Sequence, residues 1–322
     1  MHIHNFVLFC KTYSGDLDRF KILKSSVDKF NVEKVPFFIS CPRADRDLFL
    51  SLKDNSEKYE YTVLTDEEIL AVGGQEKFEC DYVTQQLVKL SFYKMHLCNN
   101  YLVVDSDSYF IRNFYEKEFM FDEQTPYFFV HEQNNRKVLY DFLDEKCIDW
   151  GRKIIKEFFG REGKNYFMPL CGNLLLSVKA LQEFEHVARE QWDKTFADLL
   201  NISPFEFIWY SEFVFNYKPH SIIPYEPLFL DFDYQIEYDI FRNLGITEDD
   251  IAKKYAGIVM QNGWVGDKRY KPIKMRKLKK NFLRFKHYLY KDRRGFDKNW
   301  PIQRKIRFYI KYSIVSLLKK VF

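Results

Sequence analysis

The first 115 residues alternate strand-like and helix-like segments, and this alternation restricts the fold more than any other feature of the chain. Apolar runs at 5–10, 35–40 and 59–64, rich in aromatic and branched aliphatic residues, predict three strands. Apolar residues recur with helical spacing at 16–30 and 84–98, which predicts amphipathic helices there. Strands that alternate with helices of about 10–15 residues are typical of βαβ units. The sequence therefore predicts an α/β fold with a mostly parallel sheet and helices on both faces.

A fourth apolar run, 101–104, is followed at once by two acids, Asp105 and Asp107. Ligands of open α/β sheets bind just outside the carboxyl ends of the strands. Two carboxylates at such a place can hold a Mg²⁺ or Mn²⁺ that arrives with a diphosphate. This arrangement suits a nucleotide-sugar site. The alternative interpretation is a solvated Asp-Ser-Asp turn that ends a buried strand.

The second half of the chain predicts a mixed α+β pattern. The expected elements are strands at 126–130, 173–177 and 257–261, helices at 149–159 and 179–192, and a short aromatic segment at 210–217. Nearer the N-terminus, Thr65 and the acids after it predict an N-cap and the acidic first turn of a helix. We expect one catalytic domain at 1–267, with a nucleotide-binding half at 1–115 and an acceptor half at 116–267.

Six cysteines are scattered along the chain, and no pair has the spacing of a CxxC motif or a zinc site. They are predicted to be small buried hydrophobic residues in a reducing compartment. The apolar run near the N-terminus, 6–10, is too short for a signal peptide, and no stretch of 18 uncharged apolar residues could span a membrane. We therefore expect a cytoplasmic location.

The net charge of +4 is the sum of an acidic part and a strongly basic part of the chain. Residues 268–322 contain 20 Lys and Arg against two acids, a balance of +18, whereas 1–267 carries −14. Apolar residues in 302–321 also fall along one helical stripe. A basic amphipathic helix is typical of peripheral binding to an anionic membrane, which we favour for the inner face of the plasma membrane. Packing of this tail on the acidic domain and binding of nucleic acid are the alternatives, and no base-reading motif supports the latter.

Several motifs resemble known families in their order. The segment Thr84-Gln85-Gln86 with Lys89, the Asp105-Ser106-Asp107 motif and Ser211-Glu212-Phe213 resemble a bacterial family of the nucleotide-diphospho-sugar transferase superfamily. The order is also similar to that of glycosyltransferase family 8. The matching groups there are Lys89, Cys171-Gly172-Asn173, Ser211-Glu212-Phe213 and Met260-Gln261-Asn262-Gly263. The resemblance covers about 3–265.

This resemblance implies a GT-A fold and a metal-dependent glycosyltransferase. The expected donor is a nucleotide-diphosphate sugar, such as a UDP-sugar, with Mn²⁺ or Mg²⁺ as cofactor. The expected acceptor is a cell-surface glycan or a lipid-linked saccharide. Gln261 stands where family 8 has a metal-ligating His, and its amide oxygen is the candidate third ligand. Glu212 replaces an Asp-Gln-Asp segment, which leaves both inversion and retention open.

The donor would meet residues from several segments. Asp107 is the candidate direct metal ligand, and Asp105 would bind the metal through water or bind the donor ribose. Lys89 could offset phosphate charge, while Gln85 and Gln86 could bind sugar hydroxyls. A solvated helix face is the alternative for these three residues.

Three further residues are candidates. Thr12 and Tyr13 follow the first strand, where a Rossmann-like half holds its nucleotide, and Tyr13 could stack on the base. Asn173 could contact the donor sugar, although a simple strand bend explains it nearly as well.

Glu212 lies in an aromatic segment, which tends to raise the pKa of a carboxyl group and suits a general base for a sugar hydroxyl. Such a base is required for inversion, which we favour over retention. The alternative is a structural carboxylate paired with a Lys or Arg.

Two other classes of function compete with a sugar transferase. A phosphatase of the haloacid-dehalogenase type also has a DxD motif, but on its first strand, whereas Asp105 follows the fourth predicted strand. A non-catalytic module that binds glycans or membranes on a transferase-like fold is the other alternative.

Overall fold

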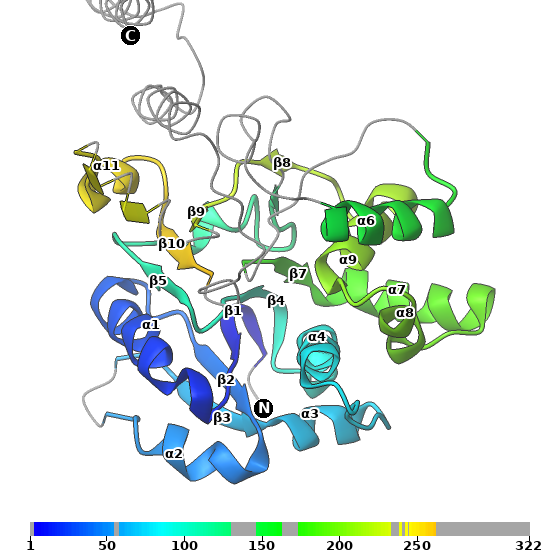
Figure 1. The fold of residues 1–322 in the computed structure, drawn as a ribbon, viewed down its shortest axis with the longest axis horizontal. Helices are drawn as coiled ribbons and strands as arrows, with labels where there is room; N and C mark the ends of the chain where they lie inside the picture. The colour runs from blue at the N-terminus through cyan, green and yellow to red at the C-terminus, as the bar shows by residue number, and fades with distance from the viewer. Residues whose placement is uncertain are drawn as a thin grey trace, which may run out of the picture.

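The structure is a computed structural model, which describes residues 3–54, 58–129, 146–162, 173–232, 238–239, 242–243 and 245–261. Its centre is a five-stranded sheet with the order β3-β2-β1-β4-β7 (Figure 1). The strands are β1 (His4–Lys11), β2 (Phe37–Cys41), β3 (Tyr61–Thr65), β4 (Cys98–Val103) and β7 (Leu175–Ser177). β1, β2, β3 and β4 are parallel neighbours, whereas β7 pairs antiparallel with β4. The predicted α/β fold and mostly parallel sheet are confirmed.

Helices cover both faces of this sheet because the side chains of its strands alternate between two apolar clusters. Along β1, Phe6 and Leu8 belong to one cluster, whereas Val7 and Phe9 belong to the other. The helices are α1 (Leu17–Phe30), α2 (Arg46–Leu50), α3 (Asp66–Val72), α4 (Asp81–Ser91), α6 (Lys146–Phe158), α7 (Val178–Trp192), α8 (Phe196–Ile202), α9 (Glu206–Tyr217) and α11 (Glu248–Ala252). α1 and α2 contribute to the first cluster, and α3, α4, α7, α8 and α9 to the second (Figure 1).

Two small sheets and several single turns complete the described part. β5 (Ser108–Phe110), β10 (Gly257–Met260) and β9 (Phe229–Phe232) form the sheet β5-β10-β9, and β6 (Phe128–Phe129) pairs with β8 (Pro224–Tyr225). The 3-10 turns are η1 (Ser14–Asp16), η2 (Arg43–Asp45), η3 (Phe92–Met95) and η4 (Glu116–Glu118). The three-stranded sheet brings the end of β10 next to the loop after β4, since β5 begins directly after Asp107.

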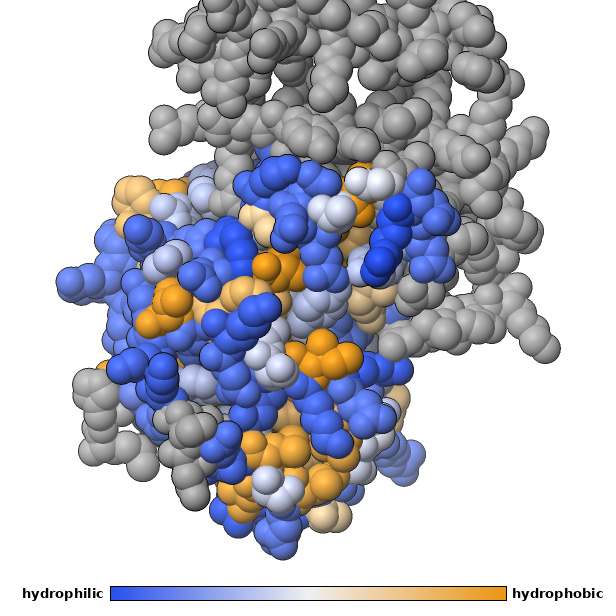
Figure 2. All heavy atoms as spheres, turned by 90° about the vertical axis from the view of Figure 1, so that its left-hand side faces the viewer, coloured by the Kyte–Doolittle hydropathy of each residue, from blue (hydrophilic) through white to orange (hydrophobic). Residues whose placement is uncertain are grey.

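The outer face of α1 is largely polar. Figure 2 shows the side of the molecule that carries α1, where hydrophilic residues predominate and apolar residues gather in separate patches. Within α1, Phe20, Leu23 and Val27 are fully buried, whereas Ile22 is exposed. The helical spacing of the apolar residues therefore predicts the inward face of α1 correctly.

Local signals explain most of the observed boundaries. Thr65 and Glu68 form a capping box at the start of α3, as the N-cap prediction requires. The helix predicted at 84–98 is too long, because α4 ends at Ser91 and a 3-10 turn follows it. His96 has a left-handed backbone (φ 52°), which ends the helical region two residues before β4. β5, α8 and β9 were not predicted, since each is short.

Some predictions fall outside the described residues. The basic tail at 268–322 lies outside them, and the division into 1–115 and 116–267 stays a prediction. Among the described helices, none has the length and apolar character required to cross a membrane.

Candidate functional site

The candidate site lies at the carboxyl edge of the main sheet, between β1 and β4. β2 and β3 lie on one side of β1, and β4 lies on the other, so the strand order reverses at this point. The crevice outside such a reversal is the usual ligand site of open α/β sheets. Thr12 follows β1, and Asp105 and Asp107 follow β4. Asn173 belongs to the same edge, because Leu174 O accepts a hydrogen bond from Val103 N at 2.9 Å.

The loop that carries the two aspartates is held by backbone and side-chain hydrogen bonds. Ser108 N donates to Asp105 O (2.9 Å), which closes a turn around the motif. Ser106 Oγ donates to Asp16 Oδ2 (3.0 Å), and Met260 N donates to Asp107 O (2.9 Å). The loop is therefore fixed both to the segment after β1 and to β10.

Asp107 has the properties of a cation ligand. Its Oδ1 atom is buried and has no hydrogen-bond partner among the described residues. Burial, together with the neighbouring Asp105 carboxylate, raises the pKa of Asp107 to about 7. A partly buried carboxylate beside another carboxylate is costly to ionise unless a positive charge is close. A divalent cation would supply that charge.

Lys89 lies on the buried side of α4 and meets Asp105. Its Nζ atom is 2.9 Å from Asp105 Oδ1 and 3.4 Å from Glu206 Oε1, and the side chain is 4% exposed. Burial by itself would lower the pKa of Lys89, but Asp105 and Glu206 outweigh that effect and raise it. Lys89 therefore carries its charge inside the site. The solvated helix face that was the alternative for Lys89 is excluded.

The two glutamines of α4 differ in their surroundings. Gln86 is buried, and its Oε1 atom lacks a hydrogen-bond partner in the part of the chain that the structure describes. Gln85 is only half-buried. Asn173 is 3% exposed, and neither polar atom of its amide group has a partner among the described residues. Gln86 and Asn173 thus keep buried hydrogen-bonding capacity that a polar ligand could use.

Gln261 follows β10 and is the candidate third metal ligand. Gln261 N donates to Phe232 O (2.9 Å), and the preceding residue is bonded to Asp107 O. The described residues contain no group of three His, Cys, Asp or Glu side chains that could hold a metal. Two carboxylates and one amide are nevertheless hard oxygen donors, and Mg²⁺ sites in phosphate-transferring proteins are often completed by the phosphates of the substrate. The unpartnered Oδ1 of Asp107 supports this fit.

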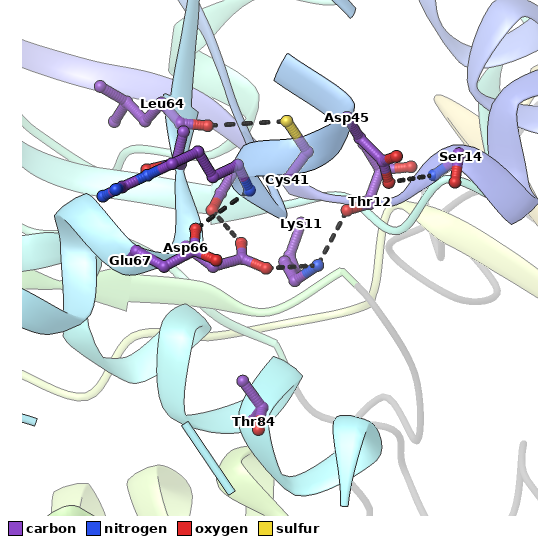
Figure 3. Close-up of polar contacts among 12 residues, drawn as sticks. Lys11, Thr12, Ser14, Cys41, Asp45, Leu64, Asp66, Glu67 and Thr84 are labelled. Carbon is purple, nitrogen blue, oxygen red and sulfur yellow. Dashed lines mark hydrogen bonds and ion pairs between the residues drawn. The ribbon is translucent and has the colours of Figure 1, made fainter. Parts of the chain in front are cut away.

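Buried polar residues also occupy the ends of β1, β2 and β3 (Figure 3). Lys11 Nζ lies 3.0 Å from Asp66 Oδ2 and donates to Thr12 O at 2.8 Å, and Ser40 Oγ donates to Asp66 Oδ1 at 2.5 Å. Burial raises the pKa of Asp66, and Lys11 opposes this shift. Thr12 is 1% exposed, and its Oγ1 atom has no hydrogen-bond partner among the described residues. Tyr13, the next residue, is half-exposed at 50%.

Glu212 has a different environment from the other candidates. The predicted aromatic setting is confirmed, since Tyr210 and Phe213 are buried on the same helix. The carboxylate, however, forms a bidentate ion pair with Arg161, in which the Arg161 Nη2 to Glu212 Oε1 distance is 2.6 Å and Nε meets Oε2. This is the ion pair that the alternative interpretation of Glu212 requires. A role as general base stays a prediction.

Three residues at the site were missed by the sequence analysis: Glu206, Lys11 and Asp66. Glu206 opens α9 and reaches Lys89 across 117 residues of sequence. Lys11 directly follows the apolar part of β1, and a lysine at that position was a usable signal. The sequence around Asp66 indicates only an acid in the first turn of a helix, and its contact with Lys11 requires knowledge of the strand order.

The chain is similar to a family of known sequences and to several solved structures. A family model described as "Family of unknown function (DUF6492)" matches residues 5–167. No curated protein matches the chain in sequence. Similar solved structures include mouse xyloside xylosyltransferase 1 in its apo form, with a TM-score of 0.44, 11% identity, and coverage of 84% of this chain and 99% of that chain.

Two further solved structures are similar to the same extent. One is the galactosyltransferase LgtC in complex with donor and acceptor sugar analogs, with a TM-score of 0.43, 11% identity, and coverage of 88% of this chain and 96% of that chain. The other is the apo structure of the bifunctional glycosyltransferase WbbM, with a TM-score of 0.48, 11% identity, and coverage of 80% of this chain and 46% of that chain.

Proposed function

The chain belongs to the DUF6492 family, and we propose that it is a metal-dependent glycosyltransferase that uses a nucleotide-diphosphate sugar as donor. The observation that carries this proposal is the position of Asp105 and Asp107. Both follow β4 at the reversal of strand order, and Asp107 keeps a buried oxygen without a hydrogen-bond partner among the described residues. A nucleoside diphosphate with a divalent cation has the charge and shape that such a place accommodates.

Each residue of the candidate site has a defined part in this proposal. Asp107, with Asp105 and Gln261, would hold Mn²⁺ or Mg²⁺. When bound, the cation would stabilise the negative charge of the departing nucleoside diphosphate. Lys89, which is paired with Asp105, would add positive charge close to the phosphates. Gln86 and Asn173 would bind sugar hydroxyls, as would Gln85, which is half-buried on α4.

The nucleotide would lie toward β1. Thr12 offers a buried hydroxyl group, and Tyr13 offers an exposed ring that could stack on a base. A UDP-linked donor follows from the resemblance of the motifs to sugar transferases.

Glu212 is the proposed base for the acceptor hydroxyl group. In single displacement, the acceptor oxygen forms a bond to the anomeric carbon as the bond from that carbon to the phosphate oxygen breaks. The hydroxyl proton passes to the carboxylate. Glu212 can accept a proton only if Arg161 no longer occupies both of its oxygens. A retaining mechanism needs no such base and is therefore the alternative to inversion.

The acceptor and the location are proposed from the sequence. A balance of +18 in 268–322 favours attachment to an anionic membrane surface. The acceptor would then be a growing cell-surface glycan or a lipid-linked saccharide at the inner face of the membrane. Nucleic acid is not an expected partner.

A thermal-shift panel of UDP, GDP, CMP and TDP sugars, each with and without Mn²⁺, tests the proposal. A ligand at 100 times its Kd stabilises the protein by about 2.7 kcal/mol, so a correct donor should be readily detected. The expected result is stabilisation by one nucleotide class that requires Mn²⁺. Absence of any response would contradict the proposed donor site.

The second candidate function is a non-catalytic module that binds glycans or membranes. The Arg161–Glu212 ion pair favours it, because the proposed base is occupied. A donor-hydrolysis assay distinguishes the two functions, since a module of this kind would bind the donor without releasing the nucleotide. A phosphatase of the haloacid-dehalogenase type is disfavoured, because the DxD motif follows β4 instead of the first strand.

A further inference from the structure

Glu206 is a buried acid that shares one lysine with the aspartate site. It is the first residue of α9 and is 5% exposed. Its Oε1 atom lies 3.4 Å from Lys89 Nζ, and the same Nζ atom lies 2.9 Å from Asp105 Oδ1. A single ammonium group therefore lies between two carboxylates that come from different elements.

The charges of this cluster do not balance. Asp105, Asp107 and Glu206 each bring one negative charge, and Lys89 brings one positive charge. The neighbouring Asp16 is paired with Arg19 at 2.8 Å, so that pair adds no net charge. When all three acids are ionised, the cluster has a net charge of −2, which is the complement of one divalent cation.

We propose that Glu206 is a positioning residue for the candidate cation site, because it shares Lys89 with Asp105 and so leaves Asp105 free to receive a divalent cation. This inference rests on the proposed function. A lysine ammonium is a compact charge with three donors, and it can serve two carboxylates at once. Without Glu206, Lys89 would form an ion pair with Asp105 alone. In a buried site with a low dielectric constant, that attraction competes strongly with a cation.

A purely structural role explains Glu206 less well. A buried ion pair is rarely more stable than apolar residues of the same size, because both charges lose their hydration. A second carboxylate on a lysine that already has Asp105 adds a further cost of burial. The arrangement is better explained by the need to hold a net negative charge that becomes balanced when a cation binds.

The test measures binding of Mn²⁺ alone to the full-length protein, followed by the electron paramagnetic resonance signal of the free ion. Loss of a residue that supports metal ligands typically weakens metal affinity on the order of 10–100-fold. Glu206→Gln is expected to weaken Mn²⁺ binding by about that factor. The matched control is Glu185→Gln, which removes the same charge from a Lys–Glu pair between α7 and η3, where Lys94 Nζ lies 2.7 Å from Glu185 Oε1. The control should bind Mn²⁺ as the wild type does.

A double variant separates positioning from simple damage to the fold. Lys89→Gln combined with Glu206→Gln restores the net charge of −2 and removes the ammonium group that competes for Asp105. Its Mn²⁺ affinity should recover toward that of the wild type, although both buried ion pairs are lost. A merely structural role for Glu206 predicts the opposite, namely a double variant at least as weak as Glu206→Gln.

The outcomes distinguish this inference from the proposed function. If the wild type binds neither Mn²⁺ nor a nucleotide sugar, both are wrong. If the wild type binds Mn²⁺ and Glu206→Gln binds it equally well, or if the double variant fails to recover, the positioning role is wrong and the proposed function stands. Circular dichroism of each variant shows whether it is folded, and the double variant decides the question if Glu206→Gln alone is unstable.

Discussion

Replacement of Asp107 by Asn should stabilise the metal-free protein while it removes cation binding. Burial and the neighbouring Asp105 raise the pKa of Asp107 from 3.8 to about 7. The pKa of Asp107 is higher in the folded than in the unfolded protein, so ionisation of Asp107 destabilises the folded state. This destabilisation is complete above about pH 7 and absent below about pH 4. The difference between the two values corresponds to about 4 kcal/mol. Since the side chain is partly exposed, we expect a gain of about 2–4 kcal/mol for Asp107→Asn at pH 8.

Urea unfolding in EDTA at pH 5 and pH 8 measures this gain. At pH 5 it should be less than half as large, because the folded wild type then holds most of its proton. Addition of Mn²⁺ should stabilise the wild type and leave the variant unchanged. Asp198→Asn is the control of opposite sign: backbone and hydroxyl hydrogen bonds from Thr195 lower the pKa of Asp198, so its loss should destabilise the protein at pH 8. A variant of Asp107 that is less stable than the wild type in EDTA at pH 8 would refute the reasoning.

Three further predictions concern other parts of the molecule. Glu212→Gln should retain donor binding and lose transfer activity by about 10²-fold or more. Arg161→Met breaks the same ion pair and should retain more activity. If both variants lose product formation equally, the ion pair is structural. Alkylation of the folded protein, followed by mass spectrometry, should modify the exposed Cys80 and spare Cys41, because burial raises the pKa of the Cys41 thiol to about 12. Rapid modification of Cys41 would contradict its buried position. Truncation after residue 270 should leave a protein that binds its donor but no longer sediments with anionic liposomes. Binding of the full-length protein to liposomes should weaken with added salt, since charges are screened beyond about 8 Å at physiological ionic strength. A truncated protein that aggregates would contradict the membrane role of the tail.

The sequence predicts the main sheet well because its signals are local. Apolar runs mark β1, β2, β3 and β4, and the spacing of apolar residues marks α1, α4 and α7. Parallel strands share a carboxyl edge, so residues that follow such strands converge whatever the details of packing. Thr12, Asp105 and Asp107 could therefore be assigned to one edge before the structure was known.

The antiparallel direction of β7 could not be predicted from its own residues. A three-residue strand carries no local signal of direction, and its pairing with β4 depends on the path of the chain before it. This direction puts Asn173 at the carboxyl edge of the sheet, because the start of an antiparallel strand lies beside the end of its partner. The candidate role of Asn173 thus has a geometric basis that the sequence lacked.

The sequence by itself determined which residues follow strands, and so where the aspartates lie in the sheet. Only the tertiary structure decided which charges meet. Lys89 could have faced solvent on α4, but the packing of α9 brings Glu206 against it from 117 residues away. In the same way, Arg161 meets Glu212 across 51 residues. Secondary structure follows from repeats over a few residues, whereas a buried ion pair depends on how segments far apart in the sequence pack against each other, which no local pattern records.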